Sequence, residues 1–512
     1  MRHEFPLIWF LVAFVAYTAL LFIISWLTGR KAGSNSFFSG DKKAPWPVVA
    51  YGMIGSTISG VTFISVPGNV WVQNFFYMPL VLGFVGGYII IAKVLLPLYY
   101  KMNLTSIYTY LGDRFGPRSH KTGTTVFMIS RLLGAAVRVY VVIVVFYAFM
   151  PKSLVNSLSP EILFMLITVV FLTLLFLYTV KGGVKTIIWT DVLQTTFMLL
   201  AVGMTIYYIC KNMDWSFGQM FSAVGDTYNS NQGSVGYGKT FTSWFDWDWS
   251  HGTNAVKQFI SGIFVTIAMT GLDQAMMQKN LACKDLKAAQ KNMYTTSIII
   301  VVVNFFFLLM GALLCVYAQQ KLGGFDALGI NKTDELFPTI ASQYFGVGAG
   351  VFFLIGLISA SYPSAGAAMT SLTTSFCVDY LKFNDRKDMG EKSKEYIRKR
   401  VHGIVALVFM VIIVILFLVS NDAVVNLVYK LASYTYGPLL GLFFFGILSK
   451  RRANDKATPW IAVVSPVLCL VFNVVSKKIW GFDLGFSLLI VNGLLTYLGM
   501  WFFSSRSNAV AK

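Results

Sequence analysis

The chain has 512 residues, of which 56% are hydrophobic and 12% charged, and a mean hydropathy of +0.66, which excludes an ordinary water-soluble domain. The formal net charge of +19 does not indicate a nucleic-acid-binding protein, because the basic residues lie in loops between apolar segments. The five cysteines are scattered without metal-ligand spacing, so the sequence predicts neither a zinc site nor a disulfide scaffold.

About thirteen segments are long and apolar enough to cross a bilayer, which takes roughly 20 residues each. They are centred near residues 18, 57, 87, 137, 169, 200, 266, 305, 362, 410, 436, 466 and 494. The first segment, from about Leu7 to Leu27, has no small-residue cleavage signature and is predicted to be a retained helix. An odd number of spans places the two termini on opposite sides of the membrane.

Lysine and arginine concentrate in alternate loops, and short loops rich in these residues stay in the cytoplasm. The distribution therefore predicts an N-terminus outside and a C-terminus in the cytoplasm. Two outer loops, near residues 212–255 and 319–346, are long for membrane connections but too short for domains. We expect short interfacial helices in both loops.

The second and seventh spans are interrupted by Gly, Ser and Thr near their centres, in AYGMIGSTISGVTFISVPG and FISGIFVTIAMTGLDQ. Such residues in one span alone also suit close helix packing. Two interruptions at corresponding positions favour an inverted-repeat transporter, whose broken helices expose backbone groups to solute and ion. The prediction is a single membrane domain over 1–512, with a first repeat over 46–211 and a second over 256–449.

Ionisable residues inside a membrane are costly and are therefore candidates for function. Those predicted to lie in spans are Lys93, Arg131, Arg138, Asp191, Asp273 and Lys430. Snorkelling or helix capping explains Lys93 and Asp273 near span ends. Arg131 and Arg138 share one helix face, so either can receive a substrate carboxylate; the alternative is neutralisation by Asp191 or by backbone carbonyls. Asp191 can bind a cation, carry a proton, or fix the adjacent loop by hydrogen bonds.

The ninth span is rich in hydroxyl side chains, which serve either as cation ligands or as hydrogen-bonding contacts between helices. They are Ser359, Ser361, Ser364, Thr370, Ser371, Thr373 and Thr374. Free carbonyls at a nearby broken helix, together with such hydroxyls, can replace the hydration shell of sodium.

Several motifs distributed over nearly the whole chain resemble those of the sodium:solute symporter family, whose bacterial members include proline, galactose, pantothenate and sialic acid carriers. The motifs are FFSG, STISGVTFISVPG, LTSIYTYLGDRFG, GGVKTIIWTDVLQ, GLDQAMMQKNLACKDLKAAQK and PLLGLFFFGILSKR. The resemblance implies an all-α integral protein of the inner (plasma) membrane. It further implies the five-plus-five inverted-repeat fold of LeuT type, which works by alternating access.

The resemblance also implies a sodium site between the broken second span and the ninth span. Its ligands would be the carbonyls of Gly55, Ile58 and Ala360 and the hydroxyl of Ser364. Pro363 stands where the family has a second hydroxyl and so weakens the site, unless Ser361, a carbonyl freed by the proline, or water substitutes. A second sodium site near Asp191 is short of oxygen ligands, because the ninth span continues with Gly366, Ala367 and Ala368.

For the solute, the family geometry points to the second and seventh spans. The residues are Thr57, Ser59, Thr62, Thr266 and Met269. Sialic acid carriers have an arginine on the fourth span, and the matching position here is Gly134, with Arg138 one turn later. An anionic solute is therefore favoured over a neutral one.

The resulting hypothesis is a secondary active symporter, not an enzyme, that moves a small polar organic solute inward with a cation gradient. The solute would be a sugar or an organic acid such as a sialic-acid-like anion. The partners would be Na+, the solute and the lipid bilayer, without cofactor or nucleic acid. Proton coupling, an amino acid or vitamin as solute, and a transporter-like solute sensor are the alternatives. A membrane enzyme is disfavoured because His3, His120, His251 and His402 are all predicted at loops or termini.

Overall fold

The computed structural model describes residues 6–29, 37–38, 40–150, 157–180, 183–226, 243–330, 332–383, 385–386, 388–419 and 424–505, with the side chains of 41 and 424–430 excepted. Regular structure in these ranges is helical, and the only β-type pairings there are isolated bridges. The all-α class is therefore confirmed.

Eleven of the described helices are long and apolar enough to span a membrane, and thirteen spans result when each of two bent helix pairs counts as one. The predicted number is confirmed. The unbroken spans are α1 (Leu7–Gly29), α5 (Met78–Ile90) with η2 (Ile91–Leu95) and α6 (Leu96–Lys101), α8 (Pro117–Ala148), α10 (Pro160–Thr179), α11 (Gly183–Met213), α15 (Leu286–Leu322), α18 (Val347–Ser375) with η6 (Phe376–Tyr380), α19 (Glu391–Val419), α20 (Val424–Leu448), α21 (Thr458–Trp480) and α22 (Leu488–Phe502).

The two bent pairs are the second and seventh spans. They are α3 (Trp46–Thr57) with α4 (Gly60–Gln73), and α13 (Ala255–Thr266) with η4 (Ile267–Gly271) and α14 (Gln274–Leu281). The bends are 60° and 68°. Both interruptions predicted from the sequence are therefore confirmed.

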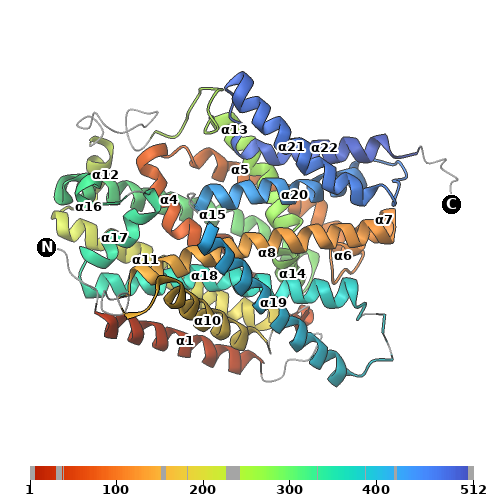
Figure 1. Cartoon of the computed structure of the whole chain (residues 1–512), viewed down its shortest axis with the longest axis horizontal. Helices are drawn as coiled ribbons and strands as arrows, with labels where there is room; N and C mark the ends of the chain where they lie inside the picture. The colour runs from red at the N-terminus through yellow and green to blue at the C-terminus, as the bar shows by residue number, and fades with distance from the viewer. Residues whose placement is uncertain are drawn as a thin grey trace.

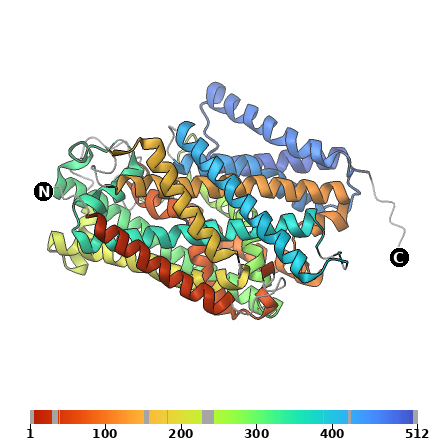
Figure 2. The same cartoon turned by 60° about the horizontal axis from the view of Figure 1, so that its bottom comes forward.

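The spans run side by side along the long axis of the molecule, with α1 beginning at one end and α22 finishing at the other (Figures 1 and 2). Short helices gather at the end where α1 begins, as expected for the two long loops. They are α12 (Phe217–Asp226), α16 (Gly324–Leu328) and α17 (Leu336–Gln343). Residues 227–242 of the first loop lie outside the described residues. The short α7 (Thr109–Phe115) lies at the opposite end.

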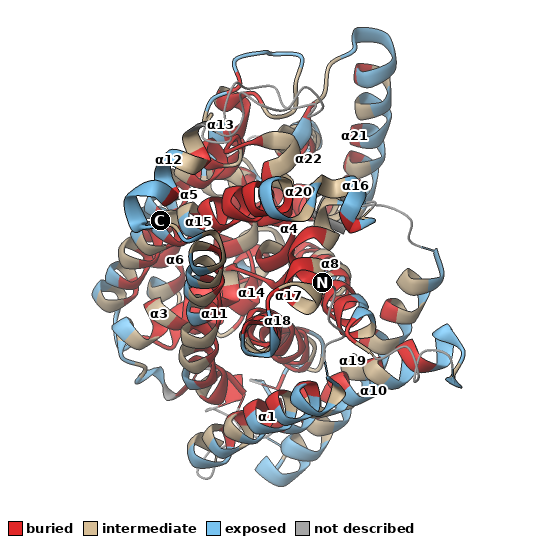
Figure 3. Cartoon of the chain, turned by 90° about the vertical axis from the view of Figure 1, so that its left-hand side faces the viewer, coloured by how far each residue is buried: buried red, intermediate tan, exposed pale blue. Residues whose placement is uncertain are grey.

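The spans divide into a buried core and a peripheral layer (Figure 3). In α18, 72% of the apolar window is buried, and in α8 and α15 the share is 67%, whereas in α1, α19 and α21 it is 28%. The outer faces of the peripheral helices carry large exposed apolar side chains, among them Trp460 and Val463. Such faces suit contact with lipid, in which helices satisfy their own backbone hydrogen bonds.

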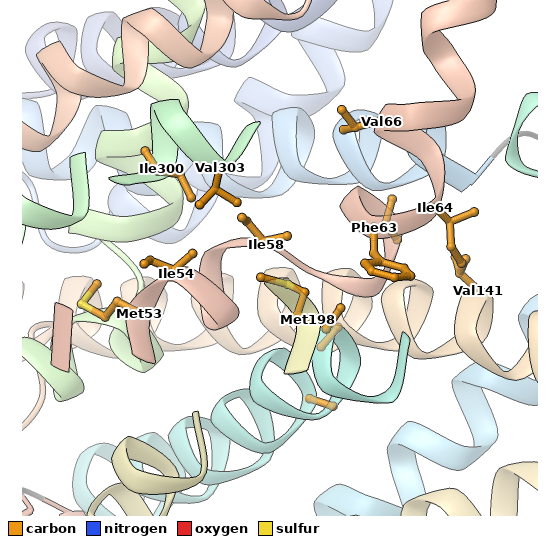
Figure 4. Packing of buried hydrophobic residues seen from close by; sticks show 14 of the residues in the cluster. Met53, Ile54, Ile58, Phe63, Ile64, Val66, Val141, Met198, Ile300 and Val303 are labelled. Carbon is orange, nitrogen blue, oxygen red and sulfur yellow. The ribbon is translucent and has the colours of Figure 1, made fainter. Parts of the chain in front are cut away.

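The first break follows from backbone geometry at Ile58 and Ser59, which are extended with φ/ψ of −85°/106° and −90°/170°. The last carbonyls of α3, that of Gly55 among them, lie at the end of the helical hydrogen-bond ladder. Gly60 allows close approach, because a Cβ there would lie 2.6 Å from the Ser361 hydroxyl of α18. Figure 4 shows Ile58 where the chain leaves α3, with Ile300 and Val303 on one side and Met198 on the other.

The second break has a charged residue at its centre. After the π-helical turn η4, Asp273 is extended (φ −101°, ψ 119°) and forms the N-cap of α14. Its carboxylate accepts a hydrogen bond from the amide of Met276 at 3.2 Å. The expectation that capping accounts for Asp273 is confirmed, although the site described below shows a second role.

Candidate functional site

A cavity of about 100 Å³ lies between the two helix breaks. Its walls come from both breaks and from α5, α8 and α15. All six residues predicted to contact the solute line it: Thr57, Ser59, Thr62, Arg138, Thr266 and Met269. The structure thus brings these side chains to one place, and their role in solute binding stays a prediction. A larger cavity of about 480 Å³ shares Tyr77 with this one and extends among α4, α21 and the loop before α13.

Sequence reasoning missed several polar residues of the cavity wall, including Tyr88 on α5, Thr270 on η4 and Asn304 on α15. The Nδ2 atom of Asn304 donates to the Ile300 carbonyl at 2.7 Å, which leaves the amide oxygen for another partner. A lone asparagine within the apolar run VVVNFFF is costly in a membrane, and this was the available signal.

Arg131 also lines the cavity and forms a buried ion pair with Asp273, which does not line it. Its Nη1 lies 3.4 Å from Oδ2 of Asp273, and its Nη2 donates to the Ser364 carbonyl at 3.4 Å. The hydroxyl of Tyr436 on α20 donates to the same Asp273 oxygen at 2.8 Å. Arg131 Nε has no hydrogen-bond partner among the described residues. The alternative that Asp191 neutralises Arg131 is wrong, because Asp273 takes that position.

Arg138 is half-buried, seven residues beyond Arg131 on the same face of α8. Between them lies Gly134, and a Cβ built there would meet nothing within 4 Å. The missing side chain leaves a small space that both arginines and Met269 line. Gly134 therefore leaves a space of about 10 Å³ beside two guanidiniums.

The predicted sodium site lies where the end of α3 packs on α18. A Cβ on Gly55 would lie 3.6 Å from Cγ of Pro363. Ile58, Ala360 and Ser364 are each at most 2% exposed. The hydroxyl of Ser364 has no hydrogen-bond partner among the described residues, which fits a role as a cation ligand.

Two details change the expected ligand set of this site. The hydroxyl of Ser361 donates its proton to the Leu357 carbonyl of its own helix at 2.6 Å, so its oxygen lone pairs are what it can offer to a cation. Pro363 lies inside α18 without ending it. A proline frees the carbonyl four residues earlier, which here belongs to Ser359 and not to Ala360. That Gly55, Ile58, Ala360, Ser361 and Ser364 bind sodium remains a prediction.

Asp191 does not fix a loop but forms a second buried ion pair. Its Oδ2 lies 2.5 Å from Nζ of Lys279 on α14 and accepts from the Ser56 hydroxyl of α3 at 2.8 Å. Lys279 stands in QKNLACKDLKAAQKN, one of the lysine-rich segments for which the alternation of charge predicts a cytoplasmic loop, yet it is 2% exposed. Gly366, on the facing part of α18, lies against the hydroxyl of Tyr178 and supplies no side-chain oxygen.

The placement of His402 corrects another sequence prediction. It lies within α19, fully buried, and its ring nitrogens contact the hydroxyls of Thr179 at 2.9 Å and Thr373 at 2.8 Å. Lys93 is exposed on η2, as snorkelling requires. The side chain of Lys430 lies outside the described residues.

Comparison with known proteins gives three concordant results. The sequence model of the sodium:solute symporter family matches residues 37–459. The sodium/sialic acid symporter SiaT of Proteus mirabilis is 25% identical over 494 residues, which are 94% of this chain and 92% of the relative. NanT of Aliivibrio fischeri, also named a sodium/sialic acid symporter, is 24% identical over 467 residues, 89% of this chain and 86% of the relative.

Two further matches are a human relative and a solved structure. Human sodium-coupled monocarboxylate transporter 1 is 22% identical over 431 residues, covering 82% of this chain and 65% of the relative. A substrate-bound outward-open structure of a Na+-coupled sialic acid symporter superposes with a TM-score of 0.79 at 20% identity, covering 98% of this chain and 100% of that one.

The thirteen spans, the two broken helices and the polar cavity between them define a multi-pass secondary transporter, not an enzyme. The chain belongs to the sodium:solute symporter family. It is accordingly a symporter with the LeuT-type fold, which moves a small solute with an ion gradient.

Proposed function

We propose that this symporter uses a Na+ gradient to take up a small organic anion that carries a carboxylate. The observation that carries the proposal is the presence of Arg131 and Arg138 on one helix face at the cavity wall. The cavity also offers the hydroxyls of Thr57, Ser59 and Thr62. Relatives named for sialic acid and for monocarboxylates support a carboxylate as the common element of the solute.

The charges at the cavity favour an anion over a neutral solute. The guanidiniums of Arg131 and Arg138 both line this cavity, and no carboxylate of the described residues does so. A guanidinium binds a solute carboxylate through two parallel hydrogen bonds. The unpartnered Nε of Arg131 provides one such donor.

Sodium coupling is supported by the unpartnered hydroxyl of Ser364 beside the end of α3. An ion bound there would hold α3 against α18 and thereby fix the break that forms one wall of the solute cavity. We place the N-terminus outside and the C-terminus in the cytoplasm of the inner membrane, so that uptake runs from the larger cavity inward.

The test is uptake into proteoliposomes that contain the purified full chain. Radiolabelled sialic acid, a short monocarboxylate such as lactate, and glucose as a neutral control are each supplied under an inward Na+ gradient. We expect saturable accumulation of an anion that stops when Na+ is equal on both sides and persists with a protonophore. Accumulation driven only by a proton gradient, or binding without movement, would contradict the proposal.

A short monocarboxylate is a second candidate solute because of the size of the cavity. At about 100 Å³ it is smaller than the roughly 300–1,000 Å³ of typical ligand pockets. Competition decides between the candidates: lactate that displaces labelled sialic acid only at high excess indicates the larger anion, and the reverse order indicates the smaller one.

A further inference from the structure

The ammonium group of Lys279 occupies a cation position between three helices. Its Nζ contacts Oδ2 of Asp191 on α11 at 2.5 Å and donates to the Ser56 hydroxyl on α3. Ser56 in turn donates to the same carboxylate oxygen at 2.8 Å. The side chains of Lys279 and Asp191 are 3% and 1% exposed, so water does not screen this contact. A closed triad of one cation and two oxygen-bearing groups results.

These oxygens are the ligands that a hard monovalent cation would otherwise use. A carboxylate and a hydroxyl are both favourable to such ions. The ammonium neutralises the carboxylate, and a second cation placed beside it would be repelled across a low-dielectric interior. Asp191 Oδ1 has no hydrogen-bond partner among the described residues, but it belongs to a carboxylate whose charge is already balanced.

The facing segment of α18 adds little that could stabilise a mobile ion at this position. Gly366, Ala367 and Ala368 carry no side-chain oxygen. Gly366 lies so close to Tyr178 that a Cβ would come within 2.5 Å of its hydroxyl, so the space there is filled. This part of α18 therefore supplies neither side-chain oxygens nor space for an ion bound in addition to the Lys279 ammonium.

We propose that Lys279 is a tethered cation that permanently fills the position at Asp191, so that this carboxylate binds no mobile Na+. The inference rests on the proposed sodium coupling and fixes its stoichiometry, because Na+ is then restricted to the site near Ser364. Replacing the lysine by a short neutral side chain vacates the position and creates one extra Na+ site.

The experiment counts bound Na+ on the purified full chain with radioactive sodium, with Na+ alone as the probe. Lys279→Ala is expected to bind one more Na+ per chain than the unmodified protein, and its melting temperature should rise more than that of the unmodified protein when NaCl replaces choline chloride. Lys279→Arg keeps the charge and is expected to show no additional ion. Equal counts for a folded Lys279→Ala and the unmodified protein would overturn the inference.

A second variant keeps the inference testable if Lys279→Ala does not fold. Lys279→Gln/Asp191→Asn retains a hydrogen-bonded neutral pair and should bind the same number of Na+ ions as the unmodified protein. Loss of one ion in this variant would show that Asp191 is a sodium ligand, and would refute the tethered cation. If the unmodified protein binds no Na+ at all, the proposed sodium coupling is contradicted. The inference about Lys279 is then tested by whether Lys279→Ala gains one ion relative to the unmodified protein.

Discussion

Two buried ion pairs hold the short helix α14, and they face different surroundings. Arg131–Asp273 lies at the N-terminal end of α14, and Arg131 lines the cavity between the helix breaks. Lys279–Asp191 lies toward the C-terminal end and contributes nothing to that cavity wall. In each pair the residue of α14 has the charge that the helix dipole favours at its end. We infer that Arg131–Asp273 acts in solute binding, whereas the ammonium of Lys279 takes the place of an ion at Asp191.

The largest expected effect concerns the Arg131–Asp273 pair. Asp273→Asn leaves a buried guanidinium without its counter-ion, which costs roughly 3–5 kcal/mol of stability. We expect a large fall in melting temperature and loss of uptake. Arg131→Gln/Asp273→Asn removes both charges and is expected to recover the stability but not the uptake. Recovery of both would mean that the pair has only a structural role.

The next effect concerns Arg138, which has no part in either pair with α14. Arg138→Gln removes a donor to the solute carboxylate, and hydrogen bonds to charged groups contribute about 1.5–3 kcal/mol. The expected result is a KM for the anion that rises about 10- to 100-fold. Arg138→Lys, the matched control, keeps the charge and should lose less. A KM unchanged in Arg138→Gln would place the solute elsewhere.

The sodium site gives a smaller effect. Ser364→Ala removes a buried hydroxyl that makes no hydrogen bond to the described residues, so stability should be kept. Half-maximal activation should need about tenfold more Na+, equivalent to about 1.4 kcal/mol. Ser465→Ala on the peripheral α21 removes a buried hydroxyl that bonds its own helix at 2.8 Å, and serves as control. Equal Na+ dependence in the two variants would argue against a ligand at Ser364.

Thr57 gives the smallest effect, although its side chain lines the cavity. Its hydroxyl donates to the Met53 carbonyl at 2.8 Å, so only its lone pairs are available to the solute. Thr57→Val should change KM by less than about threefold, equivalent to about 0.6 kcal/mol. Uptake kinetics provide the measurement, and a loss as large as that of Arg138→Gln would mean that Thr57 and Arg138 contribute equally to solute binding.

The positions of the two breaks were predictable from sequence because their cause is local. Gly, Ser and Thr near the middle of an apolar span weaken helical continuity wherever the span lies. The cap formed by Asp273 was predictable for the same reason, since a short acidic side chain at the start of a helix accepts hydrogen bonds from the first backbone amides. That Thr57, Ser59, Thr62, Thr266 and Met269 share one cavity wall was predicted instead from the resemblance to the symporter family, and the structure brings them together.

The ion pairs could not be predicted, because they depend on contacts between distant segments. Lys279 follows the break in a polar segment with three further lysines, Lys284, Lys287 and Lys291, and nothing local marks it as buried. Only the packing of α14 against α11 brings it to Asp191. The prediction that His402 lies in a loop was wrong for a similar reason. The first residues of α19 are mostly charged and resemble a loop, although the helix continues from them without a break through His402 into the apolar span.

The most direct test of the cavity between the breaks is solute protection of a cysteine at Met269. In a chain with Cys210, Cys283, Cys315, Cys377 and Cys469 replaced by serine, Met269→Cys is labelled with a thiol reagent, and Phe217→Cys on the short helix α12, outside the spans, serves as control. We predict that the transported anion slows labelling at 269 only when Na+ is present, and leaves labelling at 217 unchanged. Labelling at 269 that stays equally fast with anion and Na+ together would contradict a solute site between the two breaks.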